Sequence, residues 1–288
     1  MSGLYLTWMV DVLRNAGCNV AESSVTNGWQ TRARSSGGFP FMPLGIQWHH
    51  TASSTSPASD LSWMIDGSDD APIGNVLLDR TGTYWPVAAG ASNTAGKGGP
   101  LSLSRGTVPV DSANSQTFAI ECANNGTGES WPTVQVDAYF RGSNALNIAM
   151  GNRPDDVFTH SLGEGNGWTN RKIDPATAAA VQGGWRPRSV STSGTWSLTD
   201  IRTECNNRSG EPPPVPIPPP SGGDVADKYC VRAVDGMPWV TDFASYATQI
   251  TEDQAARGRD MRGYIVASDG GPFPLDEQDS DLMMRLDK

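Results

Sequence analysis

The stretch LGIQWHH, residues 44–50, has the composition of a β-strand in which apolar residues lead to two consecutive histidines. Successive side chains of a strand point to opposite faces, so His49 and His50 cannot both enter one site without a bulge. One histidine then faces a candidate site and the other faces the core or the opposite layer, and the spacing alone does not say which. A hydrogen-bonded structural histidine at a sheet edge is the ordinary alternative for each.

Further strands and helices are expected on both sides of this segment. Residues 75–85 are typical of a β-hairpin, and residues 117–123 form a second predicted strand. Apolar residues at helical intervals and helix-start signals predict helices at 7–17, 56–65, 131–150 and, more briefly, after Asp174. Strands that alternate with helices predict an α/β fold layered around one sheet.

The composition describes a globular chain that is long enough for two domains. Its 288 residues are 37% hydrophobic and carry a formal net charge of -10, which argues against a nucleic-acid binder. No apolar stretch approaches the roughly 20 residues of a membrane span. The four cysteines have no close spacing, which excludes a disulfide scaffold and a zinc ribbon. Any imidazole chemistry must therefore use the three histidines, His49, His50 and His160.

A proline-rich segment, EPPPVPIPPPSGG at 211–223, marks the clearest domain boundary. Seven of its 13 residues are proline, and such sequence is extended and semi-rigid. It separates a first domain at 1–210 from a small C-terminal domain at 224–288, for which short strands and a helix predict an α+β fold. The tail holds 13 acidic and 7 basic residues, a net charge of -6.

His160, in the run DVFTHS, ends a short apolar stretch where strand-end ligands commonly lie, and Asp174 follows fourteen residues later. Two imidazoles and one carboxylate are a frequent ligand set of catalytic zinc, which keeps a fourth position open for water. His160 and Asp174 with one histidine of the 49–50 pair would provide it. Asp174 before a proline is also an ordinary helix start, and the two interpretations are compatible.

Two further residues have the chemistry of an amide hydrolase. Glu121 lies on a mainly apolar predicted strand, where a carboxylate needs a partner or a role, and it could carry a proton to a leaving amine. Lys172, two residues before Asp174, would point the same way in an extended loop and could stabilise an oxyanion. A salt bridge for Glu121 and solvent exposure for Lys172 are the ordinary alternatives.

Three motifs together resemble a known family. GIQWHHTAS (45–53), TFAIECANNGTGESWP (117–132) and FTHSLGEGNGWTNRKIDPA (158–176) occur in the order and rough spacing of zinc N-acetylmuramoyl-L-alanine amidases of the Amidase_2 and peptidoglycan recognition protein superfamily. The opening stretch, with DVLRNAGCNVAE and GWQTRAR, is similar to endolysins of phages that infect actinobacteria. The resemblance covers roughly residues 6–185 and implies a central mixed β-sheet flanked by helices.

The resemblance also implies roles for individual residues. It makes His49, His160 and Asp174 the ligands of Zn²⁺, Glu121 the catalytic acid–base and Lys172 the transition-state lysine, with His50 facing away from the metal. The implied reaction is hydrolysis of the amide between N-acetylmuramic acid and the L-alanine of the stem peptide in bacterial peptidoglycan.

Several positions depart from the family pattern. The loop 161–173 is longer than usual and rich in glycine, which leaves open the register of Lys172 and Asp174 and whether the loop is a substrate lid. Asn93 replaces a common histidine near the substrate groove. We expect Asn93, Asn124 and Asn125 to donate hydrogen bonds to substrate, and Trp168 in the long loop to contact it.

Other classes of protein stay open. A binding module on the same fold would recognise muropeptide without cutting it, although such relatives typically lack a metal ligand. A cysteine peptidase would pair Cys18 with His49 or His160, but Cys18 follows a helix stop, the wrong end of the dipole for a thiolate. No G-x-S-x-G motif supports a serine hydrolase.

The expected partner of the chain is peptidoglycan, with no nucleic acid and no membrane insertion. The tail at 224–288 could anchor the enzyme on the cell wall or dock onto another protein. The start of the sequence has no signal-peptide pattern, so we expect synthesis in the host cytoplasm and later release to the wall.

Overall fold

The computed structural model describes residues 3–163, 167–176, 184–187 and 195–209, together with the backbone of 228–232 and 238–242. The chain divides into two compact units, residues 1–216 and 217–288, and each is considered separately. Within the described residues, none of the helices combines the length and apolar character needed to cross a membrane.

A six-stranded sheet in the order β1-β4-β3-β7-β2-β8 forms the centre of the first unit. Its middle strands, β2 (Ile46–His50) and β7 (Phe118–Cys122), are parallel, and β8 (Val157–Thr159) and β3 (Val76–Leu78) flank them in the same direction. β3 turns back into antiparallel β4 (Thr83–Pro86), and β1 (Asn19–Val20) closes the edge. The predicted mixed sheet is confirmed.

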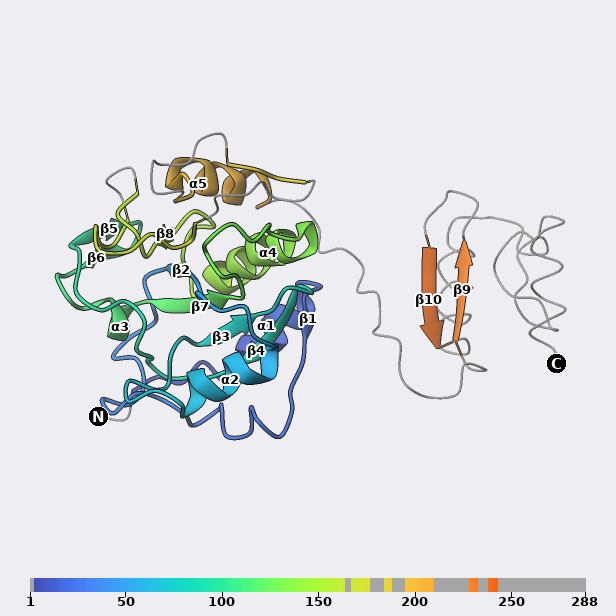
Figure 1. The fold of residues 1–288 in the computed structure, drawn as a ribbon, viewed down its shortest axis with the longest axis horizontal. Coiled ribbons are helices and arrows are strands. Elements are labelled where there is room, and N and C mark those ends of the chain that lie inside the picture. The colour runs from blue at the N-terminus through green and yellow to red at the C-terminus, as the bar shows by residue number, and fades with distance from the viewer. Residues whose placement is uncertain are drawn as a thin grey trace, which may run out of the picture. The chain divides into compact units, whose positions relative to one another are not determined.

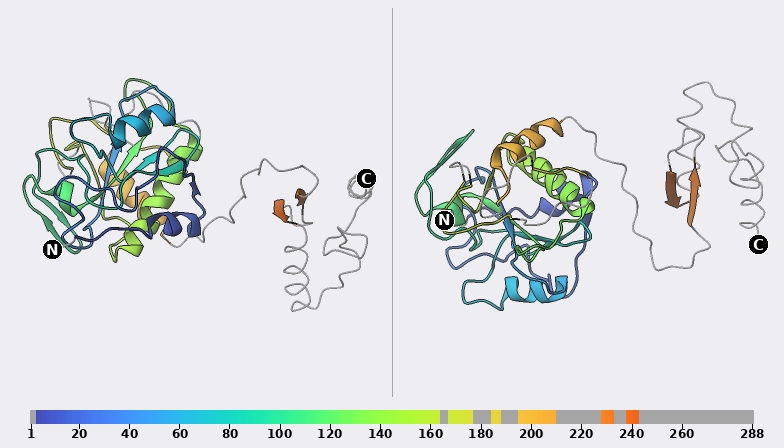
Figure 2. Two further views of the ribbon diagram at one scale, coloured as in Figure 1. Left: turned by 90° about the horizontal axis from the view of Figure 1, so that it is seen from below. Right: turned by 45° about the horizontal axis from the view of Figure 1, so that its top comes forward.

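Helices cover both faces of the sheet (Figures 1 and 2). One face carries α4 (Thr133–Ala149) and α5 (Leu198–Asn207), with α1 (Met9–Asn15) packed against α4, while α2 (Pro57–Ile65) covers the other. Short α3 (Ala113–Gln116) precedes β7, and β5 (Leu101–Leu103) pairs with β6 (Gly106–Val108) in a separate ribbon. The predicted α/β layering is confirmed.

The two faces have separate hydrophobic cores, which explains why the central strands are apolar almost throughout. In β3, Val76 and Leu78 pack in the large core under α4, whereas Leu77 packs with Leu61 and Met64 of α2. All five residues of β2 and all five of β7 are buried. A strand that is covered on both faces loses the polar alternation of a half-exposed strand.

Local signals place most elements where the sequence predicts them. The Ser56 hydroxyl accepts the Ser59 N–H at 3.3 Å, and Pro57 begins α2. Gly82 turns the β3–β4 hairpin with a φ of 79°, which only glycine adopts without strain.

The helix expected after Asp174 does not begin there. Ala176 instead pairs with Thr195 in an isolated β-bridge, and the Asp174 carboxylate contacts two histidine rings rather than capping a helix. The rest of that predicted helix, 177–183, lies outside the described residues. The prediction is therefore wrong at its start, because tertiary contacts outweigh the Asp-Pro signal.

In the second unit the structure describes one antiparallel pair, β9 (Lys228–Arg232) and β10 (Pro238–Asp242). The other strand and the helix predicted for the tail lie outside the described residues.

Gly142 of α4 tests the contact between this helix and the sheet. A Cβ at position 142 would overlap the hydroxyl of Tyr84, which donates to Ala138 O at 2.8 Å. Although alanine favours a helix, we expect Gly142→Ala to lower the free energy of unfolding by about 1–3 kcal/mol through overpacking. Urea denaturation measures this; a gain in stability would contradict the packing described here. Ile148→Ala, at an exposed position of the same helix, is the control and should change little.

Candidate metal centre

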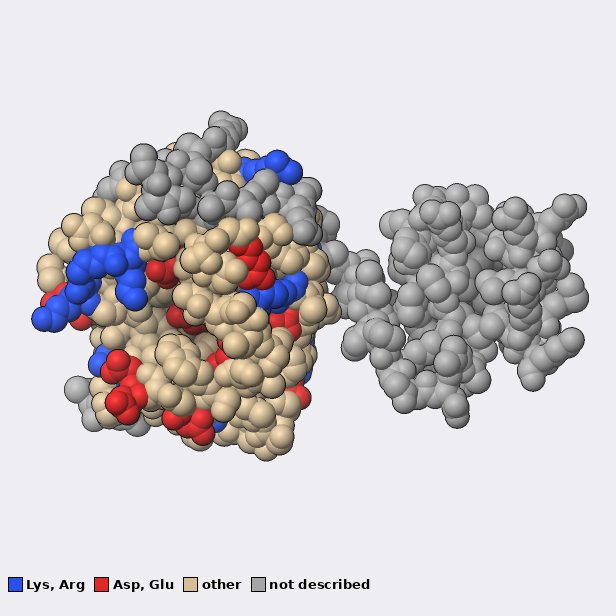
Figure 3. Space-filling model, in the orientation of Figure 1, with Lys and Arg blue, Asp and Glu red and all other residues tan. Residues whose placement is uncertain are grey.

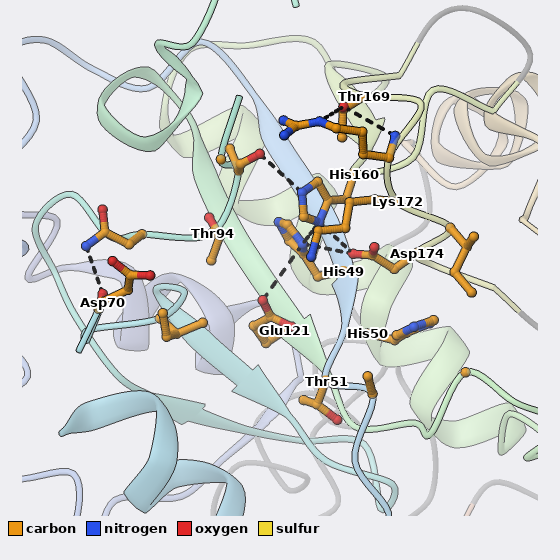
Figure 4. Close-up of a pocket in the computed structure, with 18 of the residues that line it drawn as sticks. His49, His50, Thr51, Asp70, Thr94, Glu121, His160, Thr169, Lys172 and Asp174 are labelled. Carbon is orange, nitrogen blue, oxygen red and sulfur yellow. Dashed lines mark hydrogen bonds and ion pairs between the residues drawn. The ribbon is translucent and has the colours of Figure 1, made fainter. Parts of the chain in front are cut away.

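Parallel pairing of β2 with β7 places His49 directly beside Glu121. Both side chains point to the α2 face of the sheet, whereas Trp48 packs under α4, where its ring stacks on Tyr139 with centroids 3.8 Å apart. His49 and Glu121 open into a groove of about 970 Å³. Figure 4 shows the groove with its labelled side chains, and Figure 3 shows the hollowed face that bears it, with acidic and cationic side chains gathered at different places around it.

Three buried side chains meet in this groove. His49 Nδ1 lies 3.0 Å from His160 Nδ1, and each of these nitrogens lies 3.0 Å from Asp174 Oδ2. They come from the end of β2, from the residue after β8 and from the loop that returns from it (Figure 4). The structure thus brings together the three residues that the sequence analysis named as ligands, and we call them the His-His-Asp group.

The donors of the His-His-Asp group fit a zinc ion. His160 Nε2 lies 3.1 Å from the carbonyl of Ala95, a contact that places the ring proton on Nε2 and leaves Nδ1 with a free lone pair. Two imidazole nitrogens and one carboxylate oxygen, mutually in reach of one ion, are a three-ligand set of catalytic zinc sites. Buried His49 Nε2 has no hydrogen-bond partner among the described residues.

The charge states of the group suit metal binding. Burial lowers the pKa of His49 to about 4, helped by neighbouring His160, so the ring is neutral at physiological pH. Burial alone would raise the pKa of Asp174, but hydrogen bonds from His160 and His49 outweigh it and hold the pKa well below its usual range. Neutral imidazoles and an ionised carboxylate are the forms that coordinate a cation.

Glu121 lies beside the group, with Oε1 3.8 Å from His49 Nδ1. Its burial, reinforced by the negative charge of Asp174, raises the pKa of the carboxyl well above its usual range, and Lys172 opposes the shift. The Cβ of any other residue at Gly74 would lie 3.0 Å from the Glu121 side chain, and Gly74 has a φ of 71°. This glycine therefore makes room for Glu121.

Lys172 extends into the groove from the loop before Asp174 and is exposed (Figure 4). Ser161 N–H donates to Asp174 O at 3.0 Å, and Ser161 pairs with Thr169, so the long loop folds back on itself. This pairing keeps Lys172 and Asp174 at the groove despite the length of the loop.

His50 has a different environment from His49. Its Nδ1 accepts the Ala176 N–H at 3.2 Å, and Gly126 packs against the opposite edge of its ring. His50 lines the groove at a distance from the His-His-Asp group (Figure 4).

Of the asparagines expected to contact substrate, two line the groove and one does not. Asn93 and Asn125 line the groove, although Asn93 Nδ2 donates to Asp70 O and Asn125 Oδ1 accepts the Thr127 and Glu129 N–H groups. Asn124 is fully buried, its amide bonds to its own turn, and it is not among the residues that line the groove.

Trp168, which we expected to contact substrate, lies in the interior instead. Its side chain is 1% exposed, lies in the large hydrophobic core and is absent from the groove lining. The indole N–H donates to Ala95 O at 2.8 Å, the same carbonyl that His160 contacts. Trp168 therefore anchors the loop 161–173 to the interior, because its indole N–H has its acceptor, Ala95 O, inside the protein.

Sequence reasoning missed the contribution of Tyr139, which falls within the helix expected over 131–150. The hydroxyl accepts the His49 N–H at 2.8 Å and lies 3.0 and 3.1 Å from the carbonyls of His49 and Ile120. Tyr139 thus clamps the backbone of the β2 ligand to β7. Its helical spacing gave no signal for this role.

The cysteine peptidase alternative does not fit the site. Cys18 is buried, and burial raises the pKa of its thiol to about 12. A reactive thiolate requires the opposite shift.

Comparison with known proteins agrees with this geometry. Residues 41–177 match the family described as N-acetylmuramoyl-L-alanine amidase. No curated protein matches the chain significantly.

Several solved amidases are similar to part of the chain. The amidase LysC from Clostridium intestinale URNW is 16% identical with a TM-score of 0.36, over 49% of this chain and 82% of LysC. AmpDh3 from Pseudomonas aeruginosa, in complex with anhydromuramic pentapeptide, is 17% identical with a TM-score of 0.37, over 52% and 60%. AmiD from E. coli is 17% identical with a TM-score of 0.36, over 51% and 57%.

The matched family segment contains the His-His-Asp group, Glu121 and Lys172. Residues 41–177, just under half of this chain, thus carry the similarity to the N-acetylmuramoyl-L-alanine amidase family.

Proposed function

We propose that the protein is a zinc-dependent peptidoglycan hydrolase that cleaves the amide between N-acetylmuramic acid and the L-alanine of the stem peptide. The observation that carries this proposal is the His-His-Asp group with the Glu121 carboxyl 3.8 Å from His49 Nδ1, inside the segment that matches the amidase family. His49, His160 and Asp174 would hold the metal. Zinc, when bound, supplies a Lewis acid for the scissile carbonyl and makes water more acidic.

The chain's own residues would move the protons. Glu121 takes a proton from the attacking water and returns it to the nitrogen of the leaving L-alanine, so the C–N bond breaks with a neutral amine as product. Its buried position keeps competing water away from the carboxyl. Lys172 places an ammonium in the groove, where it stabilises the oxyanion of the tetrahedral intermediate.

The groove offers further groups for the substrate. Within the part of the chain that the structure describes, the hydrogen bonds of the Asn125 side chain use Oδ1, which leaves its N–H₂ for substrate. Asn93 also lines the groove. Lys97 and Arg171 line the groove as well, and we propose that they attract the carboxylates of the stem peptide.

We further propose an endolysin-type layout of three parts. Residues 1–210 form the catalytic domain, 211–223 a proline-rich linker, and 224–288 a small domain that binds the cell wall, with docking onto another protein as the alternative. The proline content of the linker and the separate second unit support this division. A phage enzyme that lyses the host wall would use such an anchor to remain on its polymeric substrate.

The role of Glu121 is tested by Glu121→Gln, which keeps the size of the side chain but cannot take up the proton. We expect cleavage of purified peptidoglycan to fall by about 10²–10⁴-fold. The assay is mass analysis of released peptides that begin with L-alanine. Glu22→Gln, on the exposed ion pair with Arg14, should retain activity. Intact peptidoglycan after treatment with zinc-loaded wild-type protein would instead support the non-catalytic binding module.

The metal ligands are tested by comparing two neighbouring histidines. We expect His49→Ala to lose stoichiometric zinc, because a three-ligand site becomes a two-ligand site, whereas His50→Gln retains it. Elemental analysis after dialysis measures the zinc, and chelation should abolish cleavage until zinc is restored. Zinc retained by His49→Ala and lost by His50→Gln would reverse the assignment.

Wall binding by the tail is tested with the inactive Glu121→Gln chain. We expect the full-length variant to sediment with purified sacculi, and the same variant truncated after residue 210 to remain largely in solution. Because the tail has a net charge of -6, its binding should survive added salt better than simple adsorption. Equal sedimentation of both forms would refute the anchor.

A further inference from the structure

A second hollow of about 400 Å³ lies next to the catalytic groove, where the loop after β2 meets α2. The two hollows share Thr51, Ala52 and Trp63 in their linings, so they are continuous. The volume is within the range of small-ligand pockets. Thr51 lies on the opposite side of the His-His-Asp group from Thr169 (Figure 4), so this hollow extends the groove away from the long loop.

Trp63 forms the aromatic wall of this hollow. The helix α2 buries Asp60, Leu61 and Met64, and position 63 falls outside that stripe. The Trp63 side chain is 51% exposed, whereas every other tryptophan whose side chain the structure describes is buried or half-buried. An indole that packs against no core leaves an apolar face for a ligand.

The same hollow is lined by hydroxyl residues whose hydrogen bonds lead to a buried carboxylate. The Thr55 hydroxyl donates to Asp60 Oδ1 at 2.6 Å and lies 2.7 Å from Ser53 Oγ. Asp60 is 5% exposed, and its Oδ2 has no partner among the described residues. Thr51 and Ser59 also line the hollow.

The loop that bears these hydroxyls is held in place before any ligand arrives. Arg80 donates to Ser53 O at 2.6 Å and to Thr55 O at 3.3 Å, while its guanidinium pairs with Glu129 at 2.5 Å. A preorganised wall costs less conformational entropy on binding.

The lining defines the chemical class of the ligand. Among the described residues, no Lys, Arg or His side chain lines the second hollow, which disfavours an anion. One carboxylate is too few for a divalent cation that takes six to eight oxygens. A hollow that is lined by hydroxyl residues and an aromatic ring suits an uncharged ring that has an apolar face and several hydroxyls of its own.

We propose that this hollow is a saccharide subsite, in which Trp63 stacks on a sugar of the glycan strand next to the muramic acid residue that is cleaved. The assignment rests on the proposed function, because it takes the substrate to be a glycan that continues beyond the groove.

The test compares two substrates with the same stem peptide, one on a single muramic acid and one on a glycan of several repeats. For the full-length wild type we expect a higher kcat/KM on the glycan. Trp63→Ala should lower kcat/KM on the glycan by about tenfold, the effect of an aromatic stack, and leave the single-residue substrate within about twofold. Trp63→Phe should lie between. Equal losses on both substrates would overturn the subsite and place Trp63 in the catalytic groove alone.

A binding experiment separates this inference from the proposed function. A trisaccharide of N-acetylglucosamine is titrated calorimetrically into full-length Glu121→Gln with and without Trp63→Ala, and Phe41→Ala, at an exposed aromatic residue outside both hollows, is the matched control. Loss of binding with Trp63→Ala alone supports the subsite even where no substrate is cleaved. Cleavage of peptidoglycan together with trisaccharide binding that ignores Trp63 would refute the subsite and leave the amidase intact.

Discussion

The register between β2 and β7 is the constraint on which the candidate site depends. It sets His49 beside Glu121 and, on the other face, Trp48 against Tyr139. A slip of one residue would exchange the faces and bring His50 to the metal side. The buried stack under α4 and the Tyr139 hydroxyl on the His49 backbone oppose such a slip. The core on one side of the sheet therefore fixes the chemistry on the other.

Much of this arrangement could be predicted from the sequence. The strand period showed that the two histidines must separate, but only the resemblance chose His49, because both faces of β2 are covered and the alternation gives no direction. Helix α2 and the β3–β4 hairpin followed from signals within a few residues, a proline after a serine and a glycine in a turn. These local signals predict the structure correctly because no long-range contact overrides them at these positions.

The differences between the sequence-based expectations and the structure share one physical cause. In each case a polar group has its hydrogen-bond partner far away in the sequence. Asp174 has the sequence signal of a helix cap, yet His49, 125 residues earlier, takes its carboxylate. Trp168 stands in a polar loop, yet its indole N–H reaches Ala95, 73 residues earlier. Long-range hydrogen bonds that satisfy polar groups do not show in the hydrophobic periodicity of the sequence. Predictions from local sequence patterns therefore misplace these groups.

The Ala95 carbonyl shows how the loops and the candidate metal site are joined. It receives both Trp168 Nε1 and His160 Nε2, at 2.8 and 3.1 Å, so the orientation of a candidate ligand is tied to a buried indole. Gly98 and Gly99 lie against the same indole where a Cβ would not fit. The long loop after β8 is thus packed into the core at Trp168 while Lys172 stays exposed in the groove. A loop anchored in this way can hold a cation in the groove without disturbing His160 and Asp174 on either side of it. The rigid contact at Trp168 and the exposed group at Lys172 occupy different positions of one segment.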